Sequence, residues 1–195
     1  MRLGLFGGSF DPVHCGHLLV ARAALEELRL DRLVFLPAAR SPFKPDQSPA
    51  SAAVRVRMLR LALAGETRME VDDREIRRGG VSYTVDTVRE LAAEVASGTT
   101  LHWLIGEDHV ATLPAWREAA ALARLVDFVV IPRPGGTPSE PPPGFRCTAL
   151  RGWPLGVSSS EIRDRVRRGD PIHHLVPPAV AEVVSGEGLY RDPVS

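Results

Sequence analysis

Two histidines, His14 and His17, stand three residues apart just after a stretch of small residues that begins with Gly7-Gly8. A short apolar run predicts a buried strand over residues 2–6, and helical spacing of apolar residues predicts a helix from about 16 to 28. Glycines let a backbone approach an anion closely, and the free N–H groups of a helix N-terminus attract negative charge. Each imidazole can donate a hydrogen bond to a phosphate oxygen, more strongly when protonated. Together these features predict a phosphate site. Taken singly, each has a plainer interpretation, such as a simple turn or His14 as a helix cap.

A second group of phosphate-binding side chains precedes the C-terminus, in Val157-Ser158-Ser159-Ser160-Glu161-Ile162-Arg163. Hydroxyls and bare N–H groups at a helix start form an anion site, and Arg163, one turn further on, can clamp phosphate oxygens. Ser158 and Glu161 also satisfy the capping-box pattern, so helix capping is an equally good interpretation of this segment alone.

Three more stretches hold candidate side chains, each with a structural alternative. Ser82-Tyr83-Thr84-Val85-Asp86-Thr87 predicts a helix N-terminus whose donors could hold a carboxylate, and capping explains it as well. Leu104-Ile105-Gly106-Glu107-Asp108 predicts a strand end followed by an acid, or a helix cap. Trp116 could stack on a flat ring, or be a large, partly buried core residue.

Strands and helices alternate through residues 1–131, which predicts an α/β fold: a doubly wound, mainly parallel, Rossmann-like sheet with helices on both faces. Such sheets bind ligands beyond the carboxyl ends of their strands. We expect one domain over residues 1–195, with a C-terminal helical part, about 157–190, packed on it. Beyond the first strand and helix, the predicted strands are 33–36, 69–71, 101–105, 128–131 and 147–150, and the predicted helices are 50–64, 84–96, one within 115–125, 159–168 and 178–185.

The amino-acid composition indicates which class of ligand the chain binds. The 195 residues carry zero net charge, which argues against a grip on long nucleic acid and favours a small ligand. Lys44 is the one lysine among 24 basic residues. The two cysteines, Cys15 and Cys147, form no metal or secreted-type pattern and fit a reduced, cytoplasmic compartment. No signal peptide or membrane span is predicted, and nothing indicates an oligomeric state.

The Gly-Gly-Ser-Phe-Asp-Pro-Val-His-x-Gly-His segment resembles the HxGH superfamily of nucleotidylyltransferases, and the second motif is similar to that family's Ile-Ser-Ser-Thr-x-Ile-Arg. Here Val157 and Ser160 replace the usual Ile and Thr, and Ser160 keeps the hydroxyl. The resemblance implies that the motif histidines contact the phosphates of ATP. The residues implied in ATP binding are Gly7, Gly8, Ser9, Phe10, His14, His17, Gly106, Asp108, Ser159, Ser160 and Arg163.

From residue 1 to about 185, the chain resembles the bacterial nicotinate mononucleotide adenylyltransferases, on four stretches: Pro37-x-x-x-x-Pro42-Phe43-Lys44, Ser82 to Thr87, Ile105-Gly106-x-Asp108 and Leu113-Pro114-x-Trp116. Two positions depart from that family's pattern: Phe43 where histidine is common and His174 where tyrosine is usual. The residues implied in binding nicotinate mononucleotide are Ser9, Lys44, Tyr83, Thr84, Thr87, Trp116 and Arg117; those implied in catalysis, by binding phosphates, are His14, His17, Lys44 and Arg163.

The implied reaction is an in-line attack of the acceptor phosphate on the α-phosphorus of ATP. This phosphate is largely ionised near pH 7, because its second pKa is about 6, so no general base is needed. Mg²⁺ would bridge ATP oxygens with few protein ligands, and no protein metal site is predicted. The alternatives are nicotinamide mononucleotide or phosphopantetheine as acceptor, and, in another class, a nucleotide-binding regulator without turnover.

Overall fold

The computed structural model describes residues 1–42, 50–133, 140–153 and 155–191 of the chain. Within them, six strands form one sheet in the order β3-β2-β1-β4-β5-β6, and every pairing is parallel. The strands are β1 Arg2–Gly8, β2 Arg32–Pro37, β3 Met69–Val71, β4 Thr100–Gly106, β5 Val126–Ile131 and β6 Cys147–Ala149. This order confirms the doubly wound α/β prediction and places the reversal of strand order between β1 and β4.

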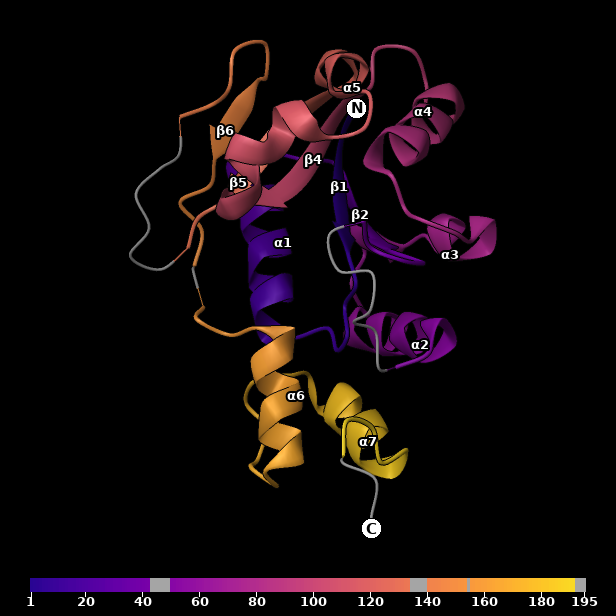
Figure 1. Cartoon of the computed structure of the whole chain (residues 1–195), viewed down its shortest axis with the longest axis vertical. Helices are drawn as coiled ribbons and strands as arrows, with labels where there is room; N and C mark the ends of the chain where they lie inside the picture. The colour runs from indigo at the N-terminus through magenta and orange to yellow at the C-terminus, as the bar shows by residue number, and fades with distance from the viewer. Residues whose placement is uncertain (43–49, 134–139, 154, 192–195) are drawn as a thin grey trace.

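Helices cover both faces of the sheet, as Figure 1 shows. They are α1 Cys15–Glu27, α2 Ala52–Ala62, α3 Arg74–Arg78, α4 Thr84–Glu94, the 3-10 helix η1 Glu107–Ala115, α5 Ala119–Leu125, α6 Ser159–Arg167 and α7 Pro178–Gly186. Two short elements differ from the prediction. Residues 77–80, predicted as a turn, contain the end of α3, and η1 precedes the helix predicted within 115–125. The helices α3 and η1 are too short or too irregular for an apolar period of 3.6 residues to show in the sequence.

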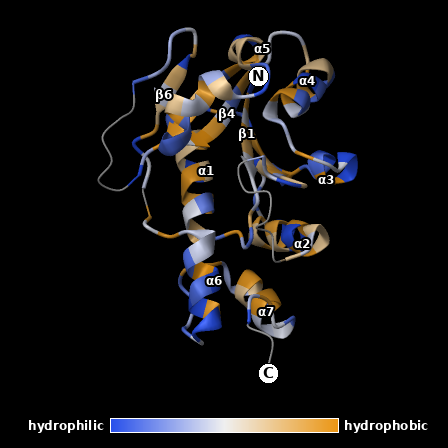
Figure 2. Cartoon of the chain, viewed as in Figure 1, coloured by the Kyte–Doolittle hydropathy of each residue, from blue (hydrophilic) through white to orange (hydrophobic). Residues whose placement is uncertain are grey.

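The four central strands, β2, β1, β4 and β5, each contribute to two apolar cores, because successive side chains point to opposite faces. Phe6 belongs to the core under α1, α2, α6 and α7, whereas its neighbour Leu5 belongs to the core under α4, η1 and α5. Leu5 itself pairs with Val34 of β2 on one side and with Trp103 of β4 on the other. The strands are therefore nearly continuous apolar runs, orange in Figure 2.

The C-terminal helices pack on the first of these cores. Ile162 of α6 and Val180 of α7 are fully buried in the same cluster as Phe6 and Phe35 of the sheet. In Figure 1 both helices lie at the lower end of the molecule, and α7 contacts α2. The second phosphate motif, at the start of α6, is thereby brought to the loop that follows β1.

Candidate active site

A cavity of about 600 Å³ opens where β1 and β4 end. That volume lies within the usual range for small-molecule sites. Five segments contribute to its lining: the loop from Ser9 into α1, the start of α6, the end of β4 with Asp108, the end of β5 with Pro132 and Arg133, and residues 150, 152, 153 and 155–157. The structure thus brings together nine of the eleven residues expected to bind ATP, namely Ser9, Phe10, His14, His17, Gly106, Asp108, Ser159, Ser160 and Arg163.

His14 and His17 cap the N-terminus of α1 reciprocally. The backbone N–H of His17 donates to Nδ1 of His14 at 3.3 Å, and the backbone N–H of His14 donates to Nδ1 of His17 at 3.2 Å. The rings stack with centroids 3.6 Å apart. Because each Nδ1 accepts, a neutral imidazole must carry its proton on Nε2. The capping interpretation and the phosphate interpretation therefore hold together: Nδ1 caps the helix, and Nε2–H remains as a donor at the cavity wall.

Both imidazoles are neutral near pH 7. Burial lowers the pKa of His14 to about 4, and burial together with the charge of His14 lowers the pKa of His17 well below its usual value. Neutral imidazoles donate weaker hydrogen bonds than protonated ones would. What the pair offers is two fixed N–H donors beside the positive end of α1.

The glycines of the first motif serve packing. Of the eleven residues expected to bind ATP, Gly7 and Gly8 are the two that do not line the cavity. A Cβ on Gly7 would lie 2.7 Å from the Trp103 ring, and one on Gly8 would lie 3.0 Å from the Phe10 ring. A Cβ on the third glycine, Gly16, would lie 3.0 Å from both Nδ1 of His14 and Cγ1 of Val157, so the absence of a side chain lets the two motifs approach each other.

Gly106 has a similar reason to be small. A Cβ there would lie 2.6 Å from Oδ1 of Asp108, so this glycine makes room for that carboxylate. Asp108 pairs with Arg133 at 3.0 Å. Burial alone would raise the pKa of Asp108, but the hydrogen bond from Arg133 and the positive charges nearby outweigh it and lower that pKa. Asp108 therefore stands ionised at the cavity edge, suited to accept hydrogen bonds from hydroxyls.

The second motif is tied to the first by hydrogen bonds. Ser158 caps α6 by accepting from the N–H of Glu161 at 3.1 Å, as its capping pattern predicts. Ser159 Oγ donates to the carbonyl of Pro12 at 2.9 Å. Arg163 donates through Nη1 to the carbonyl of Asp11 at 2.8 Å and through Nη2 to Ser160 Oγ at 3.2 Å. A buried guanidinium, two serines and two imidazoles thus surround one space that suits an anion.

A smaller cavity of about 110 Å³ lies at the N-terminus of α4. It is lined by four of the residues expected to bind nicotinate mononucleotide, Tyr83, Thr84, Trp116 and Arg117. The Trp116 ring meets Phe128 edge-on, with centroids 6.2 Å apart. The Arg117 guanidinium lies over the Tyr83 ring at 4.5 Å and 3.6 Å from Asp86. The first N–H groups of a helix have no intrahelical acceptor, so the start of α4 adds donors to this apolar slot.

Comparison with known proteins places this arrangement in a family. The cytidylyltransferase-like family model matches residues 5–165. A protein of Opitutus terrae named probable nicotinate-nucleotide adenylyltransferase is 42% identical over 98% of both chains, and one of Gemmatimonas aurantiaca with the same name is 46% identical over 98% of this chain and 93% of its own. The chain belongs to the nicotinate-nucleotide adenylyltransferase family. Like other members, it is a nucleotidyltransferase enzyme.

Solved structures support the fold. A Plasmodium falciparum nicotinic acid mononucleotide adenylyltransferase, complexed with NaAD, superposes with a TM-score of 0.76 at 18% identity and covers 97% of each chain. A putative nicotinate-nucleotide adenylyltransferase of Vibrio parahaemolyticus gives 0.68 at 19% identity, over all of this chain and 98% of its own. At such identities the likeness concerns the parallel sheet and its helices.

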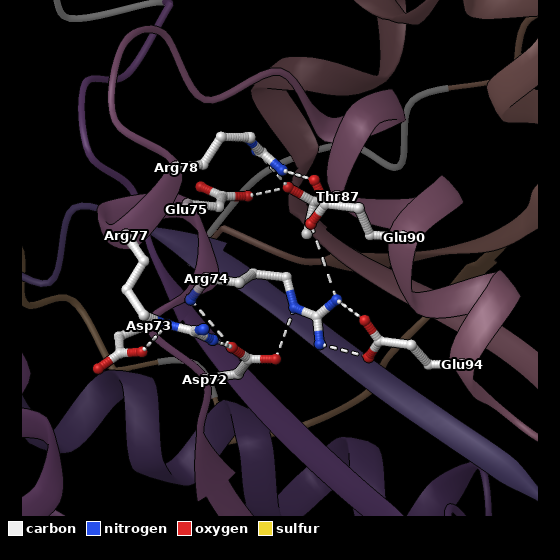
Figure 3. Close-up of polar contacts among 9 residues, drawn as sticks. All are labelled: Asp72, Asp73, Arg74, Glu75, Arg77, Arg78, Thr87, Glu90 and Glu94. Atoms are coloured by element: carbon white, nitrogen blue, oxygen red, sulfur yellow. Dashed lines mark hydrogen bonds and ion pairs between the residues drawn. The ribbon is translucent and has the colours of Figure 1, made fainter.

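In this adenylyltransferase, the side chain of Thr87 bonds residues of α3. It does not line the small cavity; it is fully buried, donates to Glu75 at 2.6 Å and accepts from Arg78 at 2.9 Å (Figure 3). Burial raises the pKa of Glu75, although hydrogen bonds from Thr87 and Ser82 oppose the rise. Thr87 thus attaches α4 to α3 through its side chain, and the contact with nicotinate mononucleotide expected of it stays a prediction.

A wider ion-pair network reinforces the attachment. Arg74 of α3 pairs with Asp72 at 2.6 Å and with Glu94 of α4 at 2.8 Å, and Arg78 pairs with Glu90 at 2.7 Å (Figure 3). The sequence did not single out Glu75. Its only signal is its helical spacing from Arg78, and its partner Thr87 lies 12 residues away on another helix.

Four further residues were singled out from the sequence: Ser9, Phe43, Lys44 and His174. Lys44 and the departure Phe43 lie outside the described residues. Ser9 lines the large cavity, and its carbonyl accepts from the buried Arg55 of α2 at 2.7 Å. His174 is exposed.

The described part of the chain lacks both a metal-binding cluster and a membrane-spanning helix. It contains no group of three or more His, Cys, Asp or Glu side chains placed to hold a metal ion. Among the same residues, no helix has the length and apolar character to cross a membrane.

Proposed function

We propose that this enzyme transfers the adenylyl group of ATP to nicotinate mononucleotide, giving nicotinate adenine dinucleotide and pyrophosphate, a step of NAD biosynthesis. One observation carries the proposal: the same fold holds a large cavity walled by two phosphate motifs and a small aromatic cavity at the start of α4. Their side chains suit, respectively, a nucleoside triphosphate and a flat, anionic ring.

The ATP phosphates lie between the two motifs in this proposal. His14 and His17 donate from Nε2, and Ser160 and Arg163 donate from the facing helix. Donors held in advance of the reaction stabilise charge that develops on the α-phosphate and on the leaving pyrophosphate. Lys44 is proposed as a further phosphate ligand from the loop after β2. Asp108 accepts from the ribose hydroxyls.

The nicotinate ring occupies the small cavity, stacked on Trp116. The N–H groups at the start of α4 and the Arg117 side chain face its carboxylate. Asp86, at 3.6 Å, partly offsets the Arg117 charge. A neutral carboxamide would gain little from that charge, whereas a carboxylate gains from the Arg117 side chain and from the N–H groups of α4. This is the basis for preferring the acid acceptor over the amide.

The reaction follows from this placement. The acceptor phosphate is already ionised, so a bound oxygen attacks the α-phosphorus in line and pyrophosphate departs. Adenylyl transfer from ATP generally uses a divalent cation, and we propose Mg²⁺ bound to the ATP phosphates as part of the substrate. The donor set fits that form: in the described cavity Asp11 is bonded to Tyr190 and Asp108 to Arg133, so neither carboxylate is set up as one of a ligand cluster.

We further propose small-molecule partners only and a cytoplasmic location. Zero net charge supports the first, since it gives no basic field for nucleic acid. Two free thiols, Cys15 and Cys147, support the second.

One assay tests the acceptor. The enzyme is incubated with ATP, Mg²⁺ and, in separate reactions, nicotinate mononucleotide, nicotinamide mononucleotide or phosphopantetheine, and pyrophosphate release is followed. We expect the highest kcat/KM with nicotinate mononucleotide and a dinucleotide product of matching mass. Turnover with phosphopantetheine alone would reject the acceptor, and no turnover with any acceptor would indicate a regulator.

A further inference from the structure

The carboxylate of Asp11, in the first motif, is held by a residue from the far end of the chain. The hydroxyl of Tyr190 donates to Oδ1 of Asp11 at 2.6 Å, across 179 positions of sequence. Asp11 is 1% exposed and Tyr190 8% exposed, so water does not compete for this bond. Charge-assisted hydrogen bonds of this kind are short and roughly twice as strong as neutral ones.

Asp11 connects four parts of the molecule. Its carboxylate accepts from the backbone N–H of Ala50, just before α2, and its carbonyl accepts from Arg163 of α6 at 2.8 Å. Arg55 of α2, also 1% exposed, grips the same loop through the carbonyl of Ser9. The loop that leads to His14 is therefore shaped by α2, α6 and the C-terminal segment together.

The C-terminal segment is bent to deliver Tyr190 to this place. After α7, the N–H of Leu189 bonds the carbonyl of Val184 at 3.0 Å, and Tyr190 takes a left-handed backbone conformation with φ of +65°. A bulky residue rarely adopts that conformation, so its surroundings must compensate for it. The buried bond to Asp11 is one such compensation.

We propose that Tyr190 is a positioning residue of the ATP site: through Asp11 it holds the loop of residues 9–14 in the shape that binds ATP phosphates. The proposal rests on the proposed function only in taking ATP as the ligand of the large cavity. Tyr190 does not line that cavity, and so it acts through Asp11, which does. A purely structural role, filling space beside α7, would require the aromatic ring and not the hydroxyl.

Replacing Tyr190 with Phe separates these roles, because it keeps the ring and removes the one donor. Oδ2 of Asp11 has no hydrogen-bond partner among the described residues, so the buried carboxylate would keep only the Ala50 N–H. We expect the loop to relax and the Kd for ATP, measured by calorimetry without an acceptor, to rise about tenfold. The KM for nicotinate mononucleotide should stay unchanged, since the small cavity lies at α4.

Leu189→Ala is the matched control. Leu189 precedes Tyr190 in the chain, packs against the same apolar core and does not line the large cavity, so its truncation lowers the melting temperature and leaves the Kd for ATP as in the wild type. An unchanged Kd in Tyr190→Phe would overturn the proposal. An equal rise of the Kd for ATP in Leu189→Ala would also overturn the proposal, because the effect would then come from lost packing.

A double-mutant cycle tests the route through Asp11. In an Asp11→Asn background the carboxylate is gone, and Tyr190→Phe should then change the Kd for ATP by less than about twofold. If the effects of the two substitutions on the Kd for ATP add fully, Tyr190 does not act through Asp11. The proposed function fails separately: a wild-type protein that binds ATP but makes no dinucleotide rejects the acceptor and leaves these measurements valid. A wild-type protein that does not bind ATP rejects both.

Discussion

His14 and His17 each accept the backbone N–H of the other through Nδ1, at 3.3 and 3.2 Å, so the pair caps α1 and fixes its own tautomers in one arrangement. A motif of two histidines three apart therefore serves the helix and the ligand at once. The Nε2–H groups are left at the cavity wall, held by the same bonds that start the helix. Because Nδ1 caps the helix and Nε2–H is the donor to the ligand, a suitable substitution can keep the cap and remove the donor.

His14→Asn should keep the helix cap and lose the phosphate donor. Asn is a preferred N-cap residue, so we expect the free energy of unfolding to change by less than about 1 kcal/mol, whereas His14→Ala should lose about 1 kcal/mol. Both variants should lose more than tenfold in kcat, because neither places an N–H where Nε2 lies. Near wild-type turnover in His14→Asn, measured at saturating substrates, would remove His14 from the phosphate site.

The buried, neutral state of His14 predicts a pH dependence of stability. Its pKa falls from the usual 6.5 to about 4 on folding, because burial disfavours the charged ring. Between these values the unfolded chain binds more protons, so this contribution to stability is complete above pH 6.5 and is lost as pH falls to 4, to a total of about 3 kcal/mol. Urea unfolding at pH 7 and pH 5 should show a smaller loss in His14→Asn than in the wild type. Equal losses would mean that His14 titrates normally in the folded protein.

Trp116 and Trp153 provide a matched pair for the two substrate sites. Trp116 lines the small cavity and Trp153 the large one. Trp116→Ala should raise the KM for nicotinate mononucleotide by about tenfold, because one aromatic stack and its apolar contact are lost. The KM for ATP should change by less than about twofold. Trp153→Ala should not change the KM for nicotinate mononucleotide. The reverse pattern in initial-rate kinetics would exchange the assignments of the two cavities.

Thr87→Val tests the attachment of α4 to α3. The change keeps the shape of the side chain but leaves the buried Glu75 without its 2.6 Å donor, which should destabilise the fold by about 1–3 kcal/mol. If α4 positions the acceptor site, the KM for nicotinate mononucleotide should also rise, and Thr87→Ser should restore it. A Thr87→Val enzyme that is less stable but keeps a wild-type KM would limit this threonine to a structural role.

Much of the site could be predicted because its motifs are local. The reciprocal cap of His14 and His17 and the cap at Ser158 each act within one turn of chain, where residue type and spacing decide the geometry. The doubly wound sheet could be predicted for a similar reason: strands buried on both faces are continuous apolar runs, and their alternation with amphipathic helices leaves few topologies.

What the sequence by itself determined was thus the fold class, the two phosphate motifs and the family resemblance that names the acceptor. Only the tertiary structure showed that Gly7 is small because Trp103 packs on it, that Thr87 belongs to Glu75, and that Tyr190 reaches Asp11. Each of these partners lies on a different element, 12 to 179 positions away. Close packing and the cost of an unpaired buried carboxylate decide such contacts, and both depend on which surfaces meet, which no local pattern of residues records.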